Sequence, residues 1–84
     1  MEPMVITADV KQIIGNITGI SPDSMSDSAS FVDDLGLDSL AILEIAVDVE
    51  KAFKIGATEE ELQSIRSIQD TVNLIVQRTV VQVS

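Results

Sequence analysis

Apolar residues recur at helical spacing near the start of the chain. They follow one another at intervals of three and four, which is the spacing of one helix face: Val10, Ile13, Ile14 and Ile17. Thr7 is a suitable residue to cap the start of such a helix, and Gly19 is a suitable residue to end it. The pattern therefore predicts a helix over about 7 to 18.

A long polar connection follows this helix, from Ser21 to Asp34. It is rich in serine and aspartate and is interrupted by Pro22. Apolar residues within it and directly after it suggest that it is held against a core: Met25, Phe31, Val32 and Leu35. A loop of this length inside a small domain is usually functional or packed as a unit.

A second helix is predicted from Asp38 or Ser39 to about Phe53 or Lys54, with Asp38 as its N-cap. One broad sector of this helix forms a core face: Ile42, Ile45, Ala46, Val49, Ala52 and Phe53. A separate stripe contains Leu40, Leu43 and Val47. A helix in so small a domain rarely buries two faces, so we expect the stripe to face a partner, with complete burial as the alternative.

The last third of the chain contains two capping patterns. Thr58 with Glu61 opens a short helix that ends near Gln63 or Ser64, and Ser67 with Asp70 opens a longer one. The longer helix has a helical apolar pattern: Ile68, Val72, Ile75, Val76 and Val80. Residues 79–83 are rich in β-branched side chains, but a lone strand would have nothing to pair with, so helix is preferred. Together these patterns predict an all-α fold, a small four-helix bundle with three longer helices and one short one, a long loop between the first two helices, and a single domain over residues 1–84.

Composition narrows the chemistry that the chain can perform. The 84 residues include no histidine and no cysteine, so imidazole bases, thiol nucleophiles and the usual zinc ligands are excluded. We therefore expect no enzyme activity. No apolar run is long enough to span a bilayer and the N-terminus does not have the pattern of a signal peptide, so we expect a cytoplasmic protein.

Acidic residues dominate the charge, with 14 acids against 5 bases and a formal net charge of −9. Between Asp33 and Glu61, nine acids stand against Lys51 and Lys54, a net of −7. Phosphate contacts need clustered lysine and arginine, so a nucleic-acid partner is not expected. A basic surface on another protein is the complementary partner.

Ser39 lies at the first position of the second helix, where free backbone N–H groups and the helix dipole would stabilise an attached phosphate. The alternative is an unmodified, solvated serine after an aspartate cap. A catalytic nucleophile is excluded because the chain has no histidine and Lys51 and Lys54 lie several turns away. The surrounding aspartates do not match the calcium-loop pattern.

The run from Asp34 to Leu40, DLGLDSL, resembles the phosphopantetheine attachment motif of acyl carrier proteins, D-x-G-x-D-S-[LV], at every position. The similarity extends over nearly the whole chain. It implies a carrier that is not itself a catalyst, with 4'-phosphopantetheine attached to Ser39 from coenzyme A by a phosphopantetheinyl transferase. Asp38 would flank the phosphate, and the reactive thiol would belong to the arm.

The resemblance also implies a face that partner enzymes read, formed by Leu40, Leu43, Glu44, Val47, Asp48 and Glu50. Acyltransferases, ketosynthases and other acyl-processing enzymes would dock there through basic surfaces, on a carrier expected to be a monomer. A groove beside Ile42, Ala46 and Ile65 would shelter the acyl chain. Ala41, Lys51 and residues 56–58 depart from the pattern of fatty-acid carriers, which speaks against a housekeeping fatty-acid role and leaves room for a polyketide or other specialised pathway.

A hypothesis of a different class is an acidic helical interaction module that never carries an arm. It would bind its basic partner whether or not Ser39 is present. The initial methionine and the self-contained pattern favour a free-standing chain over a piece of a larger synthase.

Overall fold

The computed structural model describes residues 3–83 of the chain, and the side chains of residues 4–79. The elements in order are α1 (Pro3–Thr18), the short 3-10 helix η1 (Pro22–Ser24), α2 (Ser39–Phe53), α3 (Glu59–Gln63) and α4 (Ile68–Val83). Within the described range there is no strand, and Ser30 and Ser67 form one isolated bridge. The all-α prediction, with three longer helices and one short one, is confirmed.

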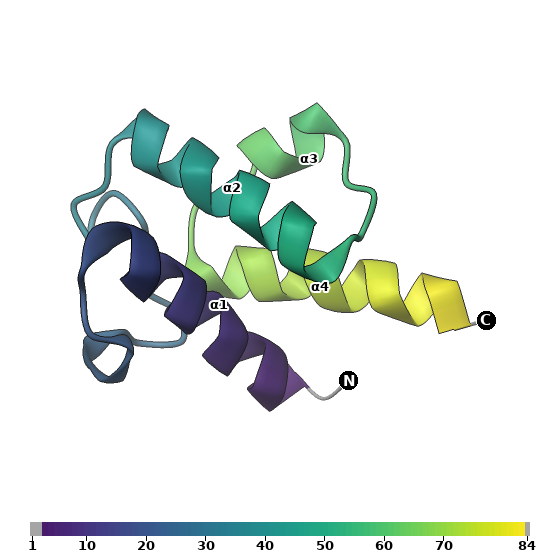
Figure 1. The fold of residues 1–84 in the computed structure, drawn as a ribbon, viewed down its shortest axis with the longest axis horizontal. Helices are drawn as coiled ribbons and strands as arrows, with labels where there is room; N and C mark the ends of the chain where they lie inside the picture. Colours follow the sequence, from purple (N-terminus) through teal and green to yellow (C-terminus); the bar gives the residue numbers. More distant parts are fainter. Residues whose placement is uncertain (1–2, 84) are drawn as a thin grey trace.

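The three longer helices surround one core, as Figure 1 shows. α1 contacts both α2 and α4, while α3 lies against α2. Residues 19–38, here called the α1–α2 connection, cover one end of this arrangement, and the start of α1 and the end of α4 lie toward the opposite end. The start of α2 is therefore placed beside the connection, away from the start of α1 and the end of α4.

α1 begins four residues earlier than its pattern predicts, at Pro3 instead of Thr7. Proline is well suited to the first position of a helix, because its missing N–H would have no intrahelical partner there. The extra turn also brings Ile6 onto the apolar face, where it is fully buried. The capping role predicted for Thr7 is wrong, since this residue lies inside the helix.

The end of α1 is determined by two glycines. Gly19 adopts a φ of 79°, in the left-handed region that terminates helices. A Cβ atom on Gly15 would lie 2.9 Å from the backbone oxygen of Ile20, so this glycine lets the chain turn back closely over the last turn of α1. The predicted end of the helix is confirmed.

The α1–α2 connection is held against the core, as predicted. Met25 and Phe31 are buried, and Leu35 packs against them. The backbone N–H of Phe31 donates to the carbonyl of Arg66 at 2.9 Å, which ties the connection to the segment before α4. Val32 does not join this core, contrary to the prediction, because Phe31 takes the inward position and leaves its neighbour 59% exposed.

α2 has the two faces that its pattern predicts, with one exception. Ile45, Ala46 and Val49 are buried, and Ile42 and Phe53 are partly buried against the same core. Ala52 was also expected there, but it is exposed. It lies at the edge of the apolar sector, and its side chain is too short to reach the core from that position.

Both capping predictions in the last third are confirmed. Thr58 and Glu61 form a complete capping box at the start of α3. Ser67 Oγ accepts a hydrogen bond from the Asp70 N–H at 3.1 Å at the start of α4. α4 continues as helix through residues 79–83 to Val83, so the preference for helix over strand was correct. The side chain of Val80, the last residue of the predicted apolar pattern, lies outside the described part.

Candidate functional site

Ser39 is presented at the start of α2 by a rigid turn. Asp38 is the N-cap, and its carboxylate accepts a hydrogen bond from the Ala41 N–H at 2.9 Å. Gly36, with a φ of 65°, allows the sharp turn before it. Leu35 and Leu37 on either side of this glycine pack against the core. The hydroxyl-bearing residue is exposed on a backbone that its neighbours fix in place.

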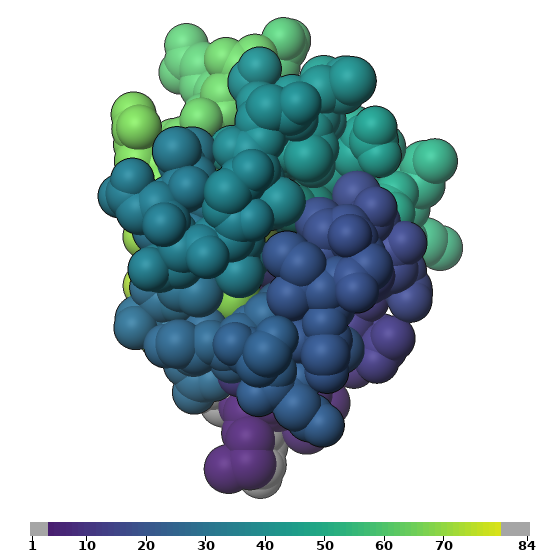
Figure 2. Space-filling model, turned by 90° about the vertical axis from the view of Figure 1, so that its left-hand side faces the viewer, coloured from purple at the N-terminus to yellow at the C-terminus, as the bar shows by residue number. Residues whose placement is uncertain are grey.

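The loop before the turn is closed by its own hydrogen bonds. The Asp34 carboxylate accepts from the Ser30 N–H at 2.7 Å, and the Ser30 hydroxyl accepts from the Asp33 N–H at 3.1 Å. Figure 2 views this end of the molecule, with the connection in blue and the start of α2 in teal above it. Asp34 therefore stabilises the loop, even though it opens the sequence motif.

An apolar stripe runs along the outer face of α2. Leu40, Leu43 and Val47 are 63%, 50% and 40% exposed, respectively, which confirms the expectation that they lie outside the core. Glu44 on the same helix is exposed and Asp48 is half-buried. This arrangement joins apolar contact area to negative charge next to Ser39.

Glu50 differs from the other acids predicted for this face. Its carboxylate accepts hydrogen bonds from the N–H groups of Gly56 and Ala57, at 3.0 Å and 2.9 Å. These bonds hold the turn between α2 and α3. We therefore assign Glu50 to the turn, and leave Glu44 and Asp48 as the acids available to a partner.

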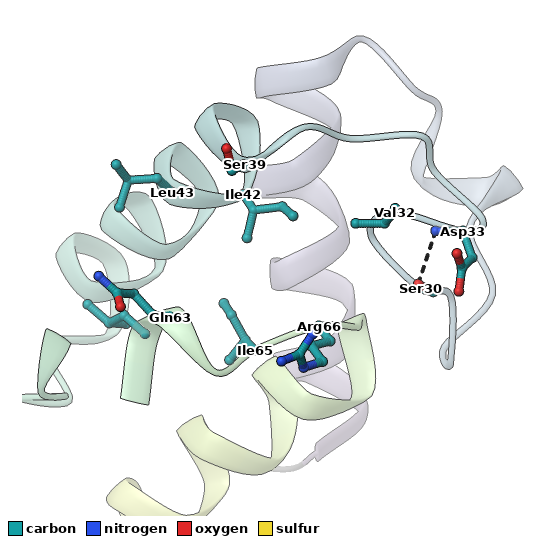
Figure 3. A pocket seen from close by; sticks show the side chains of 10 residues that line it. Ser30, Val32, Asp33, Ser39, Ile42, Leu43, Gln63, Ile65 and Arg66 are labelled. Atoms are coloured by element: carbon teal, nitrogen blue, oxygen red, sulfur yellow. Dashed lines mark hydrogen bonds between the residues drawn. The ribbon is translucent and has the colours of Figure 1, made fainter. Parts of the chain in front are cut away.

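An open groove of about 480 Å³ lies beside Ser39 (Figure 3). Its walls come from α2, from the end of α3 and the segment that follows it, and from the connection: Ser39, Ile42, Leu43, Leu62, Gln63, Ile65, Arg66, Ser30, Val32 and Asp33. Ile42 and Ile65 face one another across it. The sequence correctly placed these two residues at the groove, but Ala46 is buried in the core and does not line it.

Glu61 holds the position of α3 through two kinds of partner, a backbone N–H and an arginine side chain. The Thr58 N–H, which donates to Glu61 at 2.9 Å, is the largest cause of a lowered pKa at this carboxyl. The Arg78 guanidinium, which pairs with the same carboxylate, also lowers the pKa, while desolvation opposes both. α3 is thereby linked to α4 through a side-chain ion pair.

Two features of the site could not be found from the sequence alone. Arg66 joins the groove although it lies 27 positions after Ser39, and its only sequence signal is that it follows Ile65 directly. The Glu61–Arg78 ion pair joins residues from separate helices with no shared motif. Both depend on how α3 and α4 fold back against α2.

The described residues contain no group of three or more acidic, histidine or cysteine side chains that could hold a metal ion. No helix within the described range has the length and apolar character needed to cross a membrane. The site as described combines the exposed Ser39, an apolar groove and a charged helix face.

Comparisons with known proteins agree on this region. A family profile described as a phosphopantetheine attachment site matches residues 8–75, a range that includes Ser39. The chain is 40% identical over 70 residues to an acyl carrier protein of Rhodococcus erythropolis, covering 83% of this chain and 77% of that relative. It is 36% identical over 72 residues to an acyl carrier protein of Bdellovibrio bacteriovorus, covering 86% of this chain and 92% of the other.

A longer relative and a solved structure are also similar. The meromycolate extension acyl carrier protein of Mycobacterium leprae is 40% identical over 70 residues, which are 83% of this chain but only 61% of that protein. The solution structure of the apo doublet acyl carrier protein from prodigiosin biosynthesis matches with a TM-score of 0.78 and 30% identity, over 88% of this chain and 36% of the other.

Proposed function

The chain belongs to the phosphopantetheine-dependent acyl carrier proteins, and from this premise we propose that Ser39 is the residue to which the 4'-phosphopantetheine arm is attached. Members of this family are carriers and not catalysts. The observation that carries the proposal is the exposed Ser39 at the N-terminus of α2, inside the run that matches the attachment motif.

The residues around Ser39 fit an attached phosphate. In a helix, each N–H donates to the carbonyl four residues before it. The first N–H groups of α2 have no such carbonyl within the helix. Asp38 takes the N–H of Ala41, so those of Ser39 and Leu40 remain for an anion at this end of the dipole. The arm, when attached, supplies the thiol that holds acyl groups as thioesters. Ser39 fixes where the arm begins, and Asp38 keeps that turn rigid.

The partner face is proposed to consist of the apolar stripe with Glu44 and Asp48. Carrier proteins interact with acyl-processing enzymes, and we propose that a phosphopantetheinyl transferase, acyltransferases and ketosynthases dock here through basic surfaces. Opposite charges raise the encounter rate and orient the complex, while Leu40, Leu43 and Val47 supply apolar contact. A short-lived complex suits a carrier that must serve several enzymes.

The acyl cargo is proposed to belong to a chain-building pathway, of the fatty-acid, polyketide or a related type. One relative is named for meromycolate extension and one similar structure for prodigiosin biosynthesis, so the fold serves more than one such pathway. The apolar groove beside Ser39 supports an acyl chain as cargo, because Ile42 and Ile65 offer it a surface away from water.

The attachment is tested by incubating the chain with coenzyme A, magnesium and a promiscuous phosphopantetheinyl transferase. The mass should rise by about 340 Da, the mass of the arm. Ser39→Ala should abolish the gain, and Ser28→Ala, an exposed serine of the connection, should leave it unchanged. A gain that persists in Ser39→Ala would place the attachment elsewhere.

A further inference from the structure

Arg66 is the one positively charged residue among the described residues that line the groove. Its backbone is fixed on both sides, because its N–H donates to the Asp70 carboxylate at 3.1 Å and its carbonyl accepts from Phe31 at 2.9 Å. In the described part of the chain, its guanidinium is in neither of the two ion pairs, which are Lys11–Asp27 and Glu61–Arg78. A planar, exposed group with several N–H donors therefore lies at the edge of an apolar groove, with no ion-pair partner among the described residues.

The other polar side chains that line the groove are neutral or can only accept. The Ser30 hydroxyl accepts from the Asp33 N–H, and the side-chain nitrogen of Gln63 donates to Glu59 at 3.2 Å. The Asp33 carboxylate can only accept, and Figure 3 shows it pointing away from the groove while Val32 points toward it. Arg66 is therefore the one charged donor that the described lining of the groove offers to a ligand.

The order of residues along the groove relates this donor to the attachment point. Ser39 lies at one end, Ile42 and Ile65 face one another in the middle, and the Arg66 guanidinium lies beside Ile65 at the far edge (Figure 3). The arm lies between Ser39 and the acyl chain, so the chain enters the groove when the arm folds back along α2. Carbon atoms of the chain would then rest on the isoleucines, and an oxygen carried beyond them would meet Arg66.

We propose that Arg66 selects acyl groups that carry a hydrogen-bond-accepting oxygen near their distal end, either a carboxylate or a ketone carbonyl. This inference rests on the proposed attachment at Ser39. Guanidinium groups form strong, directional bonds with such oxygens, and bidentate ones with carboxylates. A hydrocarbon end would instead take solvent from the guanidinium without replacing the lost hydrogen bonds.

The test uses three acyl forms of the full chain, each loaded enzymatically from the corresponding acyl-coenzyme A analogue: hexanoyl, 5-oxohexanoyl and adipoyl. Melting temperatures are compared for the wild type, Arg66→Gln and the matched control Lys51→Gln, which removes one positive charge from an exposed site on α2 away from the groove. In the wild type and in Lys51→Gln, at least one oxygenated form should melt about 4 °C above the hexanoyl form, since a single added hydrogen bond has an effect of this size in so small a domain.

Arg66→Gln should remove this difference, and the Arg66 side-chain NH signal in the NMR spectrum should shift on loading with the oxygenated chain but not with hexanoyl. A larger response to the ketone or to the adipoyl form identifies which oxygen is preferred. Equal melting temperatures for all three wild-type forms would overturn the inference. An Arg66 NH signal that shifts as much in the hexanoyl form as in the oxygenated forms would also overturn the inference, because it would indicate contact with the phosphate of the arm. Failure of loading at Ser39, seen first by mass, would instead contradict the proposed function.

Discussion

Individual acidic residues of this chain perform different tasks despite their similar side chains. Asp38 caps α2 and Asp34 closes the loop before it, while Glu50 holds the turn after it. The cap at Asp38 could be predicted from the sequence, because capping depends on local spacing. The role of Glu50 could not be predicted from local spacing. Its carboxylate bonds to the N–H groups of residues 56 and 57, and it can reach them only because Lys54 and Gly56 adopt positive φ and turn the chain back.

Glu50→Ala should destabilise the domain more than Glu44→Ala. The first change removes two hydrogen bonds between a carboxylate and the backbone. Their loss should lower the free energy of unfolding by about 2 kcal/mol. Glu44 is exposed, so its loss should change that free energy by less than about 0.5 kcal/mol. Urea denaturation of both variants measures the difference, and equal midpoints would contradict the role given to Glu50.

Glu61 should make the stability of the domain sensitive to acid. Its pKa in the folded protein lies below its ordinary value, chiefly because of the Thr58 N–H and then Arg78. The folded state therefore favours the ionised form, and this contribution is present above the ordinary glutamate pKa of about 4.3 and is lost as the pH falls through the lower folded pKa.

Glu61→Gln isolates this effect when it is compared with Glu60→Gln, which removes the same charge from the same turn of α3. At pH 7 the Glu61→Gln variant should melt at the lower temperature. The gap between the two variants should close as the pH is lowered from about 4.3 toward 2. A gap that is independent of pH across this range would show that ionisation of Glu61 does not stabilise the fold.

At the scale of the elements, α2 has an inner face that holds the fold together and an outer face that is free for contact. This division followed from helical spacing alone, and the burial of Val49 beside the exposure of Val47 bears it out. The start of α1 was wrongly predicted, because Thr7 is a suitable capping residue although Ile6, four positions before Val10, continues the same apolar spacing. The groove depended on the return of residues 62–66 to α2, which no local pattern encodes.

Val47→Asp and Val49→Asp should separate binding from folding. Val47 is 40% exposed, so a carboxylate there stays hydrated, the melting temperature changes little, and docking to an acyl-processing enzyme weakens because the apolar stripe is interrupted. Val49 is 0% exposed, and a buried, unpaired carboxylate should unfold the domain. Circular dichroism melting of both variants is the measurement. Similar melting temperatures would mean that the two faces of α2 are wrongly assigned.

At the scale of the whole molecule, negative charge is concentrated around the site. The net charge is −9, and residues 33–61 carry nine acids against two lysines, a net of −7. The uneven distribution was evident from the sequence. The structure confirms that Glu44 and Asp48 lie on the helix that begins at Ser39, and it adds that Glu50 is occupied by the turn after this helix.

Salt should therefore slow the association of the carrier with a basic partner enzyme. The Debye length falls from about 10 Å at 0.1 M salt to about 3 Å at 1 M, so long-range attraction is largely screened at the higher concentration. Stopped-flow association rates should fall steeply over this range for the wild type and less steeply for a variant with both Glu44→Gln and Asp48→Asn. Identical salt dependence for the two proteins would exclude these acids from the encounter.

The central claim is that the arm is attached to Ser39, and the location of the added mass tests it most directly. After loading, trypsin should release the peptide between Lys11 and Lys51, which contains Ser39 together with Ser21, Ser24, Ser26, Ser28 and Ser30. Fragmentation of this peptide should place a gain of about 340 Da on Ser39. A peptide without added mass, or a gain on any of the other five serines, would contradict the account.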